Sequence, residues 1–400
     1  MSHGTYSIWL HPWDLFDEGA DTVLHNIADL ARLDTVNLAV SYHSGKFQPL
    51  HNPKHSLYYA EDGVVYFSPH TEAYHSSRIL PAVSRNYPED SLALLTERAR
   101  SFGLRVATWV VCNHNSRLCQ EHPEAAIQTI DGDREVNFLC PNNPDVRKYV
   151  LGLVEDIGMN YDIQTFDMES PGYPDGVSHG FHHEFLTLPL EPLMDQLLST
   201  CFCGDCERKA KEFGVNLQEV RAKLIQIIHN WRKIPVPVLE STSREKEGIN
   251  FLGALLSEPT LLELFRFKKL VVNEVLSEAR EKLPKGIELN LITLPLSSNF
   301  PEDCSFLDAS KICDSFELLC YTKNHSDVYY DAFWTRQLTR PDCRLSISLR
   351  SGYPAITSAE LLTQQAGAAR KAGADGLSFY NYGATPLTMF PAIGALVGKD

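Results

Sequence analysis

Eight short apolar runs, rich in β-branched and aromatic residues, constrain the fold of this chain more than any other feature. They are followed by polar, glycine or proline residues and then by stretches with helical periodicity, which is the pattern of a βα unit. The runs are Tyr6–His11, Thr35–Tyr42, Leu104–Val111, Tyr161–Met168, Ile287–Leu294, Phe316–Tyr321, Arg344–Arg350 and Asp375–Tyr382. Eight such units predict an α/β fold of the (β/α)8 TIM barrel type.

The segments between the runs favour the barrel over its main alternative. LLTERARSFG before the third run and AELLTQQAGAARKAGADG before the eighth have helical patterns that end in glycine, as a helix C-cap prefers. A doubly wound sheet would also alternate strands and helices. It would carry a glycine-rich phosphate-binding turn after the first strand, where this chain has HPWDLFDEG.

The segment between the fourth and fifth runs is far longer than one crossover helix. It contains the cysteine-rich stretch CFCGDCERKAKEFG and the amphipathic stretch NLQEVRAKLIQIIHNW. We therefore expect residues 1–400 to form a single barrel, in which residues 170–265 are an inserted helical subdomain that contains the cysteines. The helices of this insertion could supply the surface of a homo-oligomer.

Charge and composition exclude several classes of partner. The formal net charge of −15 argues against nucleic acid and anionic membranes, because both require a positive surface. The start of the chain lacks the pattern of a signal peptide, and no apolar run is long enough to span a membrane. We expect a cytoplasmic protein whose cysteines are mostly free thiols and whose partner is a small, neutral substrate.

Active sites of TIM barrels lie at the carboxyl ends of the strands, so the polar residues that finish each run are the candidates. The substrate-binding candidates are His11, Tyr42, His43, Asn113, His114, Tyr321, Arg350, Tyr380 and Asn381. Several are tyrosines, whose flat apolar faces and polar tips suit sugar rings.

Asp167 and Glu169 are the candidate catalytic residues, because only the fourth run ends in clustered carboxylates. Side chains two residues apart on a strand share a face, so both can point into the barrel mouth. Two close carboxylates repel when both are ionised, which yields a proton donor beside a carboxylate, as glycosidic bond cleavage needs. The alternative is a structural pair that caps a neighbouring loop.

The run from Asp162 to Glu169 is similar to the D-x-x-D-x-D-x-E strand of chitinase-like family 18 glycoside hydrolases, with Thr165 in place of the second acidic residue. The resemblance implies that Glu169 is the acid/base, that Asp167 orients a substrate N-acetyl group, and that Asp162 is a distant support. Tyr321 resembles the tyrosine that assists this acetamido group. The implied reaction is retaining and substrate-assisted.

A broader resemblance covers much of residues 137–383. LCPNNPDVRKYVLGLVED, CFCGDCERKAKEFG and AGADGLSFYNYG look like segments of bacterial barrel glycosidases with poorly defined substrates. If the substrate does not assist, a second carboxylate must act, and Asp14, Asp175 and Glu184 are the candidates beside Asp167. A carboxyl separation of ~5–5.5 Å would indicate a retaining enzyme and ~6.5–9.5 Å an inverting one.

Cys201, Cys203 and Cys206 form a C-x-C-x-x-C cluster. Three soft ligands this close could hold a structural zinc, completed by Cys112, Cys119, Cys140 or a histidine. Buried free thiols and redox chemistry are the other two interpretations. In each case the cluster would not perform hydrolysis, which we expect to need no cofactor.

Three functions follow from these patterns. The first is a glycoside hydrolase acting on a small sugar conjugate through Glu169 and Asp167. The second is a metal-dependent hydrolase or isomerase built on His11, His43 and His114, and the third is a non-catalytic carbohydrate-binding barrel. The loop histidines His179, His182 and His183 lack helical spacing, so we interpret that loop as a substrate-contacting or solvated segment.

Overall fold

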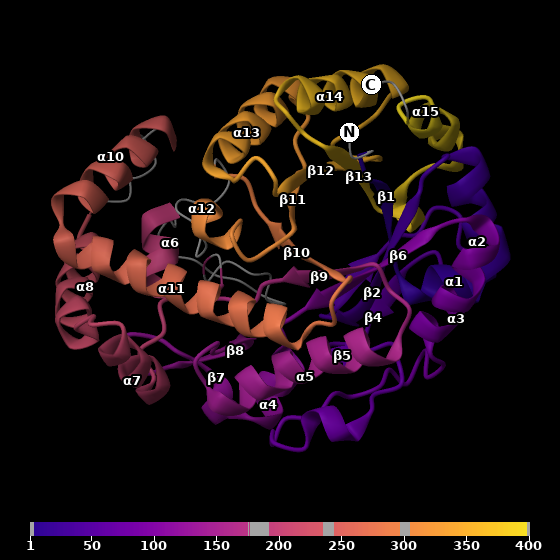
Figure 1. Cartoon of the computed structure of the whole chain (residues 1–400). Coiled ribbons are helices and arrows are strands. Elements are labelled where there is room, and N and C mark those ends of the chain that lie inside the picture. Colours follow the sequence, from indigo (N-terminus) through magenta and orange to yellow (C-terminus); the bar gives the residue numbers. More distant parts are fainter. Residues whose placement is uncertain (1–3, 175, 177–191, 235–243, 297–304, 398–400) are drawn as a thin grey trace.

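The computed structural model describes residues 4–174, 176, 192–234, 244–296 and 305–397. Its centre is a ring of eight parallel strands with helices around the outside (Figure 1). The strands of the ring are β1 (Tyr6–Leu10), β2 (Thr35–Tyr42), β6 (Arg105–Val111), β9 (Thr165–Glu169), β10 (Glu288–Thr293), β11 (Ser315–Cys320), β12 (Arg344–Arg350) and β13 (Gly376–Tyr380). The ring closes because β1 pairs with both β2 and β13, which confirms the predicted TIM barrel.

The remaining elements connect or extend the barrel. The helices are α1 (Pro12–Glu18), α2 (Ala20–His25), α3 (Ser91–Ala99), α4 (Ser116–Glu121), α5 (Pro144–Asn160), α6 (Pro192–Leu198), α7 (Gly204–Glu212), α8 (Leu217–Trp231), α10 (Arg244–Ser257), α11 (Pro259–Lys282), α12 (Phe306–Ala309), α13 (His325–Leu338), α14 (Ala359–Lys371) and α15 (Phe390–Gly394). The short strands are β3 (Gly45–Phe47) with β4 (Tyr58–Ala60), β7 (Ala126–Gln128) with β8 (Arg134–Leu139), and β5 (Val64–Val65) on the edge of β2.

Local sequence signals account for the helix ends. Asn143 begins α5 because its side chain accepts hydrogen bonds from two backbone amides of the first turn, and Pro144 follows where no amide hydrogen is needed. The side chain of Ser358 caps α14 by accepting a hydrogen bond from the backbone amide of Leu361. Gly103, which ends the first of the two predicted helical stretches, has positive φ, a conformation that residues with a Cβ rarely adopt. In the second stretch the glycine with positive φ is Gly373, whereas Gly376, which ends that stretch, begins β13.

The fourth barrel strand begins four residues later than the sequence predicts. Residues 161–164 do not join β9, because the backbone amide of Tyr161 still donates to Ile157 of α5. Asp162 lies in this connection and forms an ion pair with Arg100 on the surface. The strand instead extends to Glu169, so both candidate carboxylates lie within it.

Successive side chains of the barrel strands point alternately outward, toward the helices, and inward, toward the barrel interior. Outward side chains such as Val36, Phe166 and Leu345 are buried against the surrounding helices. Inward side chains at mid-barrel are polar. They include Ser7, Asn37, Asp167, Asn290, Glu317 and Ser346, which line a cavity of about 30 Å³. The barrel interior therefore holds buried carboxyl groups beneath the mouth.

Between β9 and β10 the described residues contain α6, α7, α8, α10 and α11. Figure 1 shows α6, α7, α8 and α10 as a lobe beside the barrel, while α11 runs from this lobe back along α5. The lobe has its own apolar core, which also includes Ile127, Phe138 and Cys140 from the β7–β8 hairpin. The hairpin thus joins the barrel side of the molecule to the lobe.

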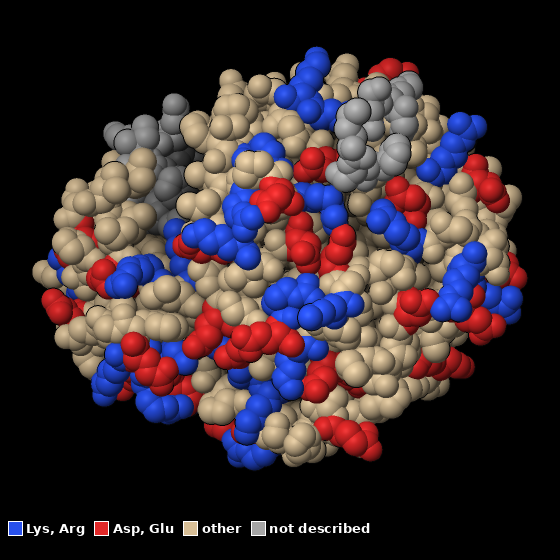
Figure 2. Space-filling view, viewed as in Figure 1, with Lys and Arg blue, Asp and Glu red and all other residues tan. Residues whose placement is uncertain are grey.

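The surface carries charges of both signs. Figure 2 shows Lys and Arg interspersed with Asp and Glu on the face that it draws. Many are paired, as in Arg78 with Asp145 and Lys282 with Glu155. Within the described ranges, no helix combines the length and the apolar character needed to cross a membrane.

Candidate active site

Asp167 lies inside the barrel, below the mouth, and both of its carboxylate oxygens are occupied. Asn37 Nδ2 donates to Oδ2 at 2.7 Å, and Asn290 Nδ2 donates to Oδ1 at 2.9 Å. Burial raises the pKa of Asp167 to about 7, although these two hydrogen bonds oppose the shift. Asp167 therefore changes charge near neutral pH while its position stays fixed by neighbouring strands.

Glu169 lies two residues further along β9, at the carboxyl end of the strand. Trp109 Nε1, from the adjacent strand β6, donates a hydrogen bond to Glu169 Oε2. Trp109 is buried, and its indole nitrogen orients the candidate acid. A sequence pattern does not reveal that contact, because it joins two strands.

Three tyrosines surround this carboxylate. A side-chain hydrogen bond joins Tyr42 from β2 and Tyr380 from β13, and the rings of Tyr321 and Tyr380 lie 5.1 Å apart. Burial raises the pKa of each tyrosine, and the charge of Glu169 adds to each rise. Their hydroxyl groups remain protonated at neutral pH and can donate to a bound ligand.

Arg350 ends β12 beside Tyr380 in the sheet register. Its Nε atom is buried and has no hydrogen-bond partner among the residues that the structure describes. Tyr321 also reaches β12, with its hydroxyl 3.4 Å from Ser348 Oγ. The structure thus brings Glu169 together with Tyr42, Tyr321, Arg350 and Tyr380, which are four of the predicted substrate-binding residues.

The predicted histidines lie on the neighbouring strand ends. His11 is buried, its ring stacks on Trp13 at 4.3 Å, and its Nε2 atom has no hydrogen-bond partner within the described ranges. Burial lowers the pKa of His11 to about 3, and His43 adds to this effect, so the imidazole is neutral. The rings of His43 and His114 stack on each other at 4.4 Å. In the described part of the chain, these three histidines do not form a group that could hold a metal.

Asn113 and Asn381 use their side chains to hold loops. Asn113 Nδ2 donates to the carbonyl oxygens of Pro171 and Gly172, in the loop that leaves Glu169. Asn381 Oδ1 accepts from the backbone amide of Ala384 and so caps the turn after β13. Both residues border the site and shape the loops around it.

The remaining acidic candidates lie in different places. Asp14 is buried in α1, where Oδ2 accepts from the backbone amide of His11 at 2.9 Å. Burial raises the pKa of Asp14 to about 7. Asp175 and Glu184, and the loop histidines His179, His182 and His183, lie outside the described residues.

Glu317 is a buried carboxyl group that the sequence analysis missed. It lies in the middle of β11 and accepts a hydrogen bond from Ser378 Oγ, which in turn accepts from Trp9 Nε1 at 3.0 Å. Burial raises the pKa of Glu317 to about 8, and the charge of Asp167 adds to the rise. The period-two alternation of FELLCY contains the signal, because it places Glu317 on the inward face.

Replacing Glu317 with Gln is expected to make stability less dependent on pH. The pKa of a glutamate carboxyl is ordinarily 4.5, and burial raises the pKa of Glu317 in the folded protein to about 8. Below 4.5 both states are protonated; between the two values the unfolded state loses its proton first, so the free energy of unfolding falls as pH rises. The fall is at most about 1.4 kcal/mol per pH unit from this group and levels off above the folded pKa. Thermal unfolding midpoints across this pH range test the idea, and equal slopes for wild type and E317Q would contradict it.

No model of a known protein family matches the sequence. No curated protein matches it either. Solved structures resemble it in fold. The PgaB (BpsB) glycoside hydrolase domain from Bordetella bronchiseptica aligns with a TM-score of 0.56 at 13% identity, covering 98% of this chain and 98% of that chain. The catalytic domain of a β-amylase from Paenibacillus polymyxa gives 0.56 at 10%, also covering 98% of both.

The α-L-fucosidase isoenzyme 2 from Paenibacillus thiaminolyticus has a TM-score of 0.55 at 12% identity, over 94% of this chain and 45% of that chain. At such identities the likeness establishes a shared fold and leaves individual residues unassigned. This chain therefore has the fold of TIM-barrel glycoside hydrolases.

Proposed function

We propose that this protein is a glycoside hydrolase that cleaves the glycosidic bond of a small sugar conjugate, with Glu169 as the general acid and base. The observation that carries the proposal is the setting of Glu169, which is held by Trp109 at the barrel mouth and surrounded by three tyrosines. A fixed carboxyl group among flat aromatic rings suits protonation of a glycosidic oxygen. The solved structures of similar fold include glycoside hydrolases, which agrees with this class of chemistry.

The reaction that fits best is retaining and substrate-assisted. Of the carboxylates on the described barrel strands, Glu288 pairs with Arg344 at the opposite end, and Glu317 and Asp167 lie below the mouth. Glu169 alone among them ends its strand at the mouth. A 2-acetamido group of the substrate would then attack the anomeric carbon, Glu169 would donate its proton to the leaving oxygen, and the same carboxylate would later activate water.

The other residues take supporting roles in this proposal. Tyr321 and Tyr380 are protonated hydroxyl donors beside Glu169 and can orient the acetamido group or ring hydroxyls. Arg350 Nε, which has no partner in the part of the chain that the structure describes, offers a further donor. Asp167 acts through its charge, because its own oxygens are already bound by Asn37 and Asn290.

Turnover of a panel of nitrophenyl glycosides, including N-acetylhexosaminides, tests this proposal. We expect release of nitrophenol from N-acetylhexosaminides and retention of anomeric configuration in the first product observed by NMR. Cleavage of sugars without an acetamido group would overturn substrate assistance and name the substrate class. Binding of sugars without turnover would instead support a non-catalytic carbohydrate-binding barrel.

A further inference from the structure

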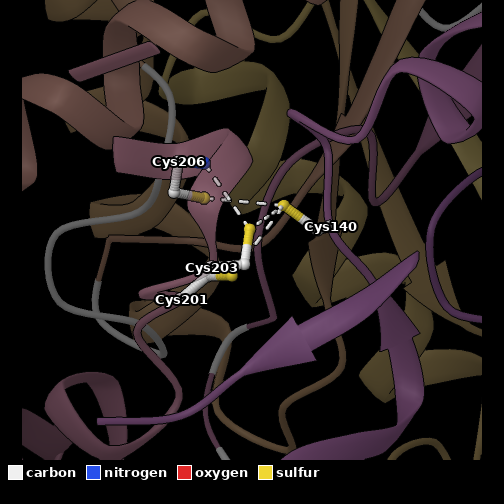
Figure 3. A group of neighbouring side chains, drawn as sticks. All are labelled: Cys140, Cys201, Cys203 and Cys206. Carbon is white, nitrogen blue, oxygen red and sulfur yellow. Dashed lines mark hydrogen bonds between the residues drawn. The ribbon is translucent and has the colours of Figure 1, made fainter. Parts of the chain in front are cut away.

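Four cysteine sulfur atoms meet where the β7–β8 hairpin contacts the inserted lobe (Figure 3). Cys140 directly follows β8, Cys203 caps the N-terminus of α7, and Cys206 lies in its first turn. Cys201 precedes them on the same segment. All four sulfur atoms lie within 4.8 Å of one another, and all four residues are buried.

The separations between these sulfur atoms fit one tetrahedral metal ion. Cys140 Sγ lies 3.5 Å from both Cys203 Sγ and Cys206 Sγ, and 3.8 Å from Cys201 Sγ. Four thiolates at a zinc–sulfur distance of ~2.3 Å would be ~3.8 Å apart at the corners of a tetrahedron. A disulfide requires ~2.05 Å, and the cysteines of the described residues form none.

Hydrogen-bond donors point at the sulfur atoms from the surrounding chain. The backbone amide of Gln128 donates to Cys201 Sγ at 3.4 Å, and that of Cys206 donates to Cys203 Sγ at 3.5 Å. Asn142 Nδ2 donates to Cys206 Sγ at 3.3 Å. Such donors stabilise thiolates around a metal, whereas four neighbouring thiolates without a cation would repel one another.

We propose that Cys140, Cys201, Cys203 and Cys206 bind one zinc ion as a closed, four-thiolate structural site. Sequence spacing identifies the last three as a cluster, and the fold supplies Cys140 as the fourth ligand. Four protein ligands leave no open coordination position, so the ion has no part in hydrolysis. This inference stands independently of the proposed glycosidase activity.

The zinc site would hold the loop that leaves the candidate active site. Tyr173 lies in that loop, with its hydroxyl 2.7 Å from Asn142 Nδ2 and 3.6 Å from Cys206 Sγ. The same loop is fixed from the barrel side by Asn113, which binds the carbonyl oxygens of Pro171 and Gly172. The ion would therefore connect the hairpin, α7 and the segment that follows Glu169.

Metal analysis of the intact protein, purified without metal-affinity resin from zinc-supplemented medium, tests the proposal. We expect about one zinc per chain and, after exchange with cobalt, the visible spectrum of a tetrahedral tetrathiolate complex. Iron in place of zinc would overturn the choice of metal. Protein without bound metal and without that cobalt spectrum would overturn the site itself.

Substitutions locate the ligands. Cys140→Ser and Cys206→Ser are each expected to lose most of the bound zinc and to lower the thermal unfolding midpoint. Cys343→Ser, which also replaces a buried cysteine but lies outside the cluster, should keep one zinc per chain. Full zinc content in both cluster variants would contradict the assignment. If these variants do not fold, the cobalt spectrum of the wild type still decides.

Discussion

Glu169→Gln is expected to lower kcat/KM by a factor of about 10²–10⁴ on whichever glycoside the wild type cleaves, since a general acid contributes about that much. Glutamine keeps the shape of the side chain and an oxygen that Trp109 Nε1 can still bind. It cannot donate a proton to the leaving oxygen. The loss should be smallest for nitrophenyl leaving groups, which need little protonation, and larger for sugar leaving groups.

Glu97→Gln is the matched control for this variant. Glu97 is exposed on α3, outside the barrel, so the same loss of a carboxylate there should leave both activity and stability unchanged. Thermal unfolding of E169Q should match the wild type within a few degrees, because no buried contact is removed. Full activity in a correctly folded E169Q would exclude Glu169 as the acid.

Asp167→Asn is expected to lower kcat by a factor of roughly 30, and to remove a limb of the pH profile. Positive charge develops on the sugar in the transition state. Two residues along a strand span ~7 Å, and a unit negative charge at that distance stabilises the transition state by about 2 kcal/mol at an effective dielectric constant of ~20. Ionised Asp167 is therefore the more active form. Because burial raises its pKa to about 7, wild-type activity should fall as pH drops through that value. D167N should lack this limb.

The same variant should also be less stable. Both oxygens of Asp167 accept hydrogen bonds from amide groups, so an introduced Nδ2 would face a donor from Asn37 or Asn290. A buried donor left unsatisfied costs about 1–3 kcal/mol. Asp156→Asn removes a buried, hydrogen-bonded carboxylate from α5 outside the barrel, so it measures the effect of lost stability alone. Equal losses of activity and the same pH profile in both variants would remove Asp167 from the mechanism.

The barrel could be predicted because the sequence pattern of each βα unit is local and is repeated along the chain. Each strand carries outward apolar residues that pack on helices, so the runs stand out even where the inward positions are polar. The predicted start of β9 was wrong. Tyr161 is a residue type common in strands, but its backbone amide completes the last turn of α5. Element boundaries depend on such competition between neighbouring hydrogen-bond partners.

The sequence could predict the members of the candidate site only where they lie at the ends of barrel strands. Glu169 and Tyr380 end their strands and Tyr321 directly follows β11, and the position of strand ends in a barrel follows from the fold alone. Glu317 was missed because it lies in mid-strand, and Cys140 could not be chosen over Cys112 or Cys119. The identification of Glu317 and of Cys140 depends on contacts between residues far apart in the chain, and the periodicity of the sequence does not encode such contacts.

The closure of the ring between β1 and β13 has a consequence for how the chain folds. Tyr6 aligns with Leu377, so one edge of β1 has no partner until almost the whole chain has been synthesised. An unpaired strand edge is a template for aggregation, and pairing between distant segments is slow to form. We therefore expect refolding from denaturant to pass through an open-ring intermediate, and truncation before Gly376 to yield insoluble protein rather than a smaller barrel.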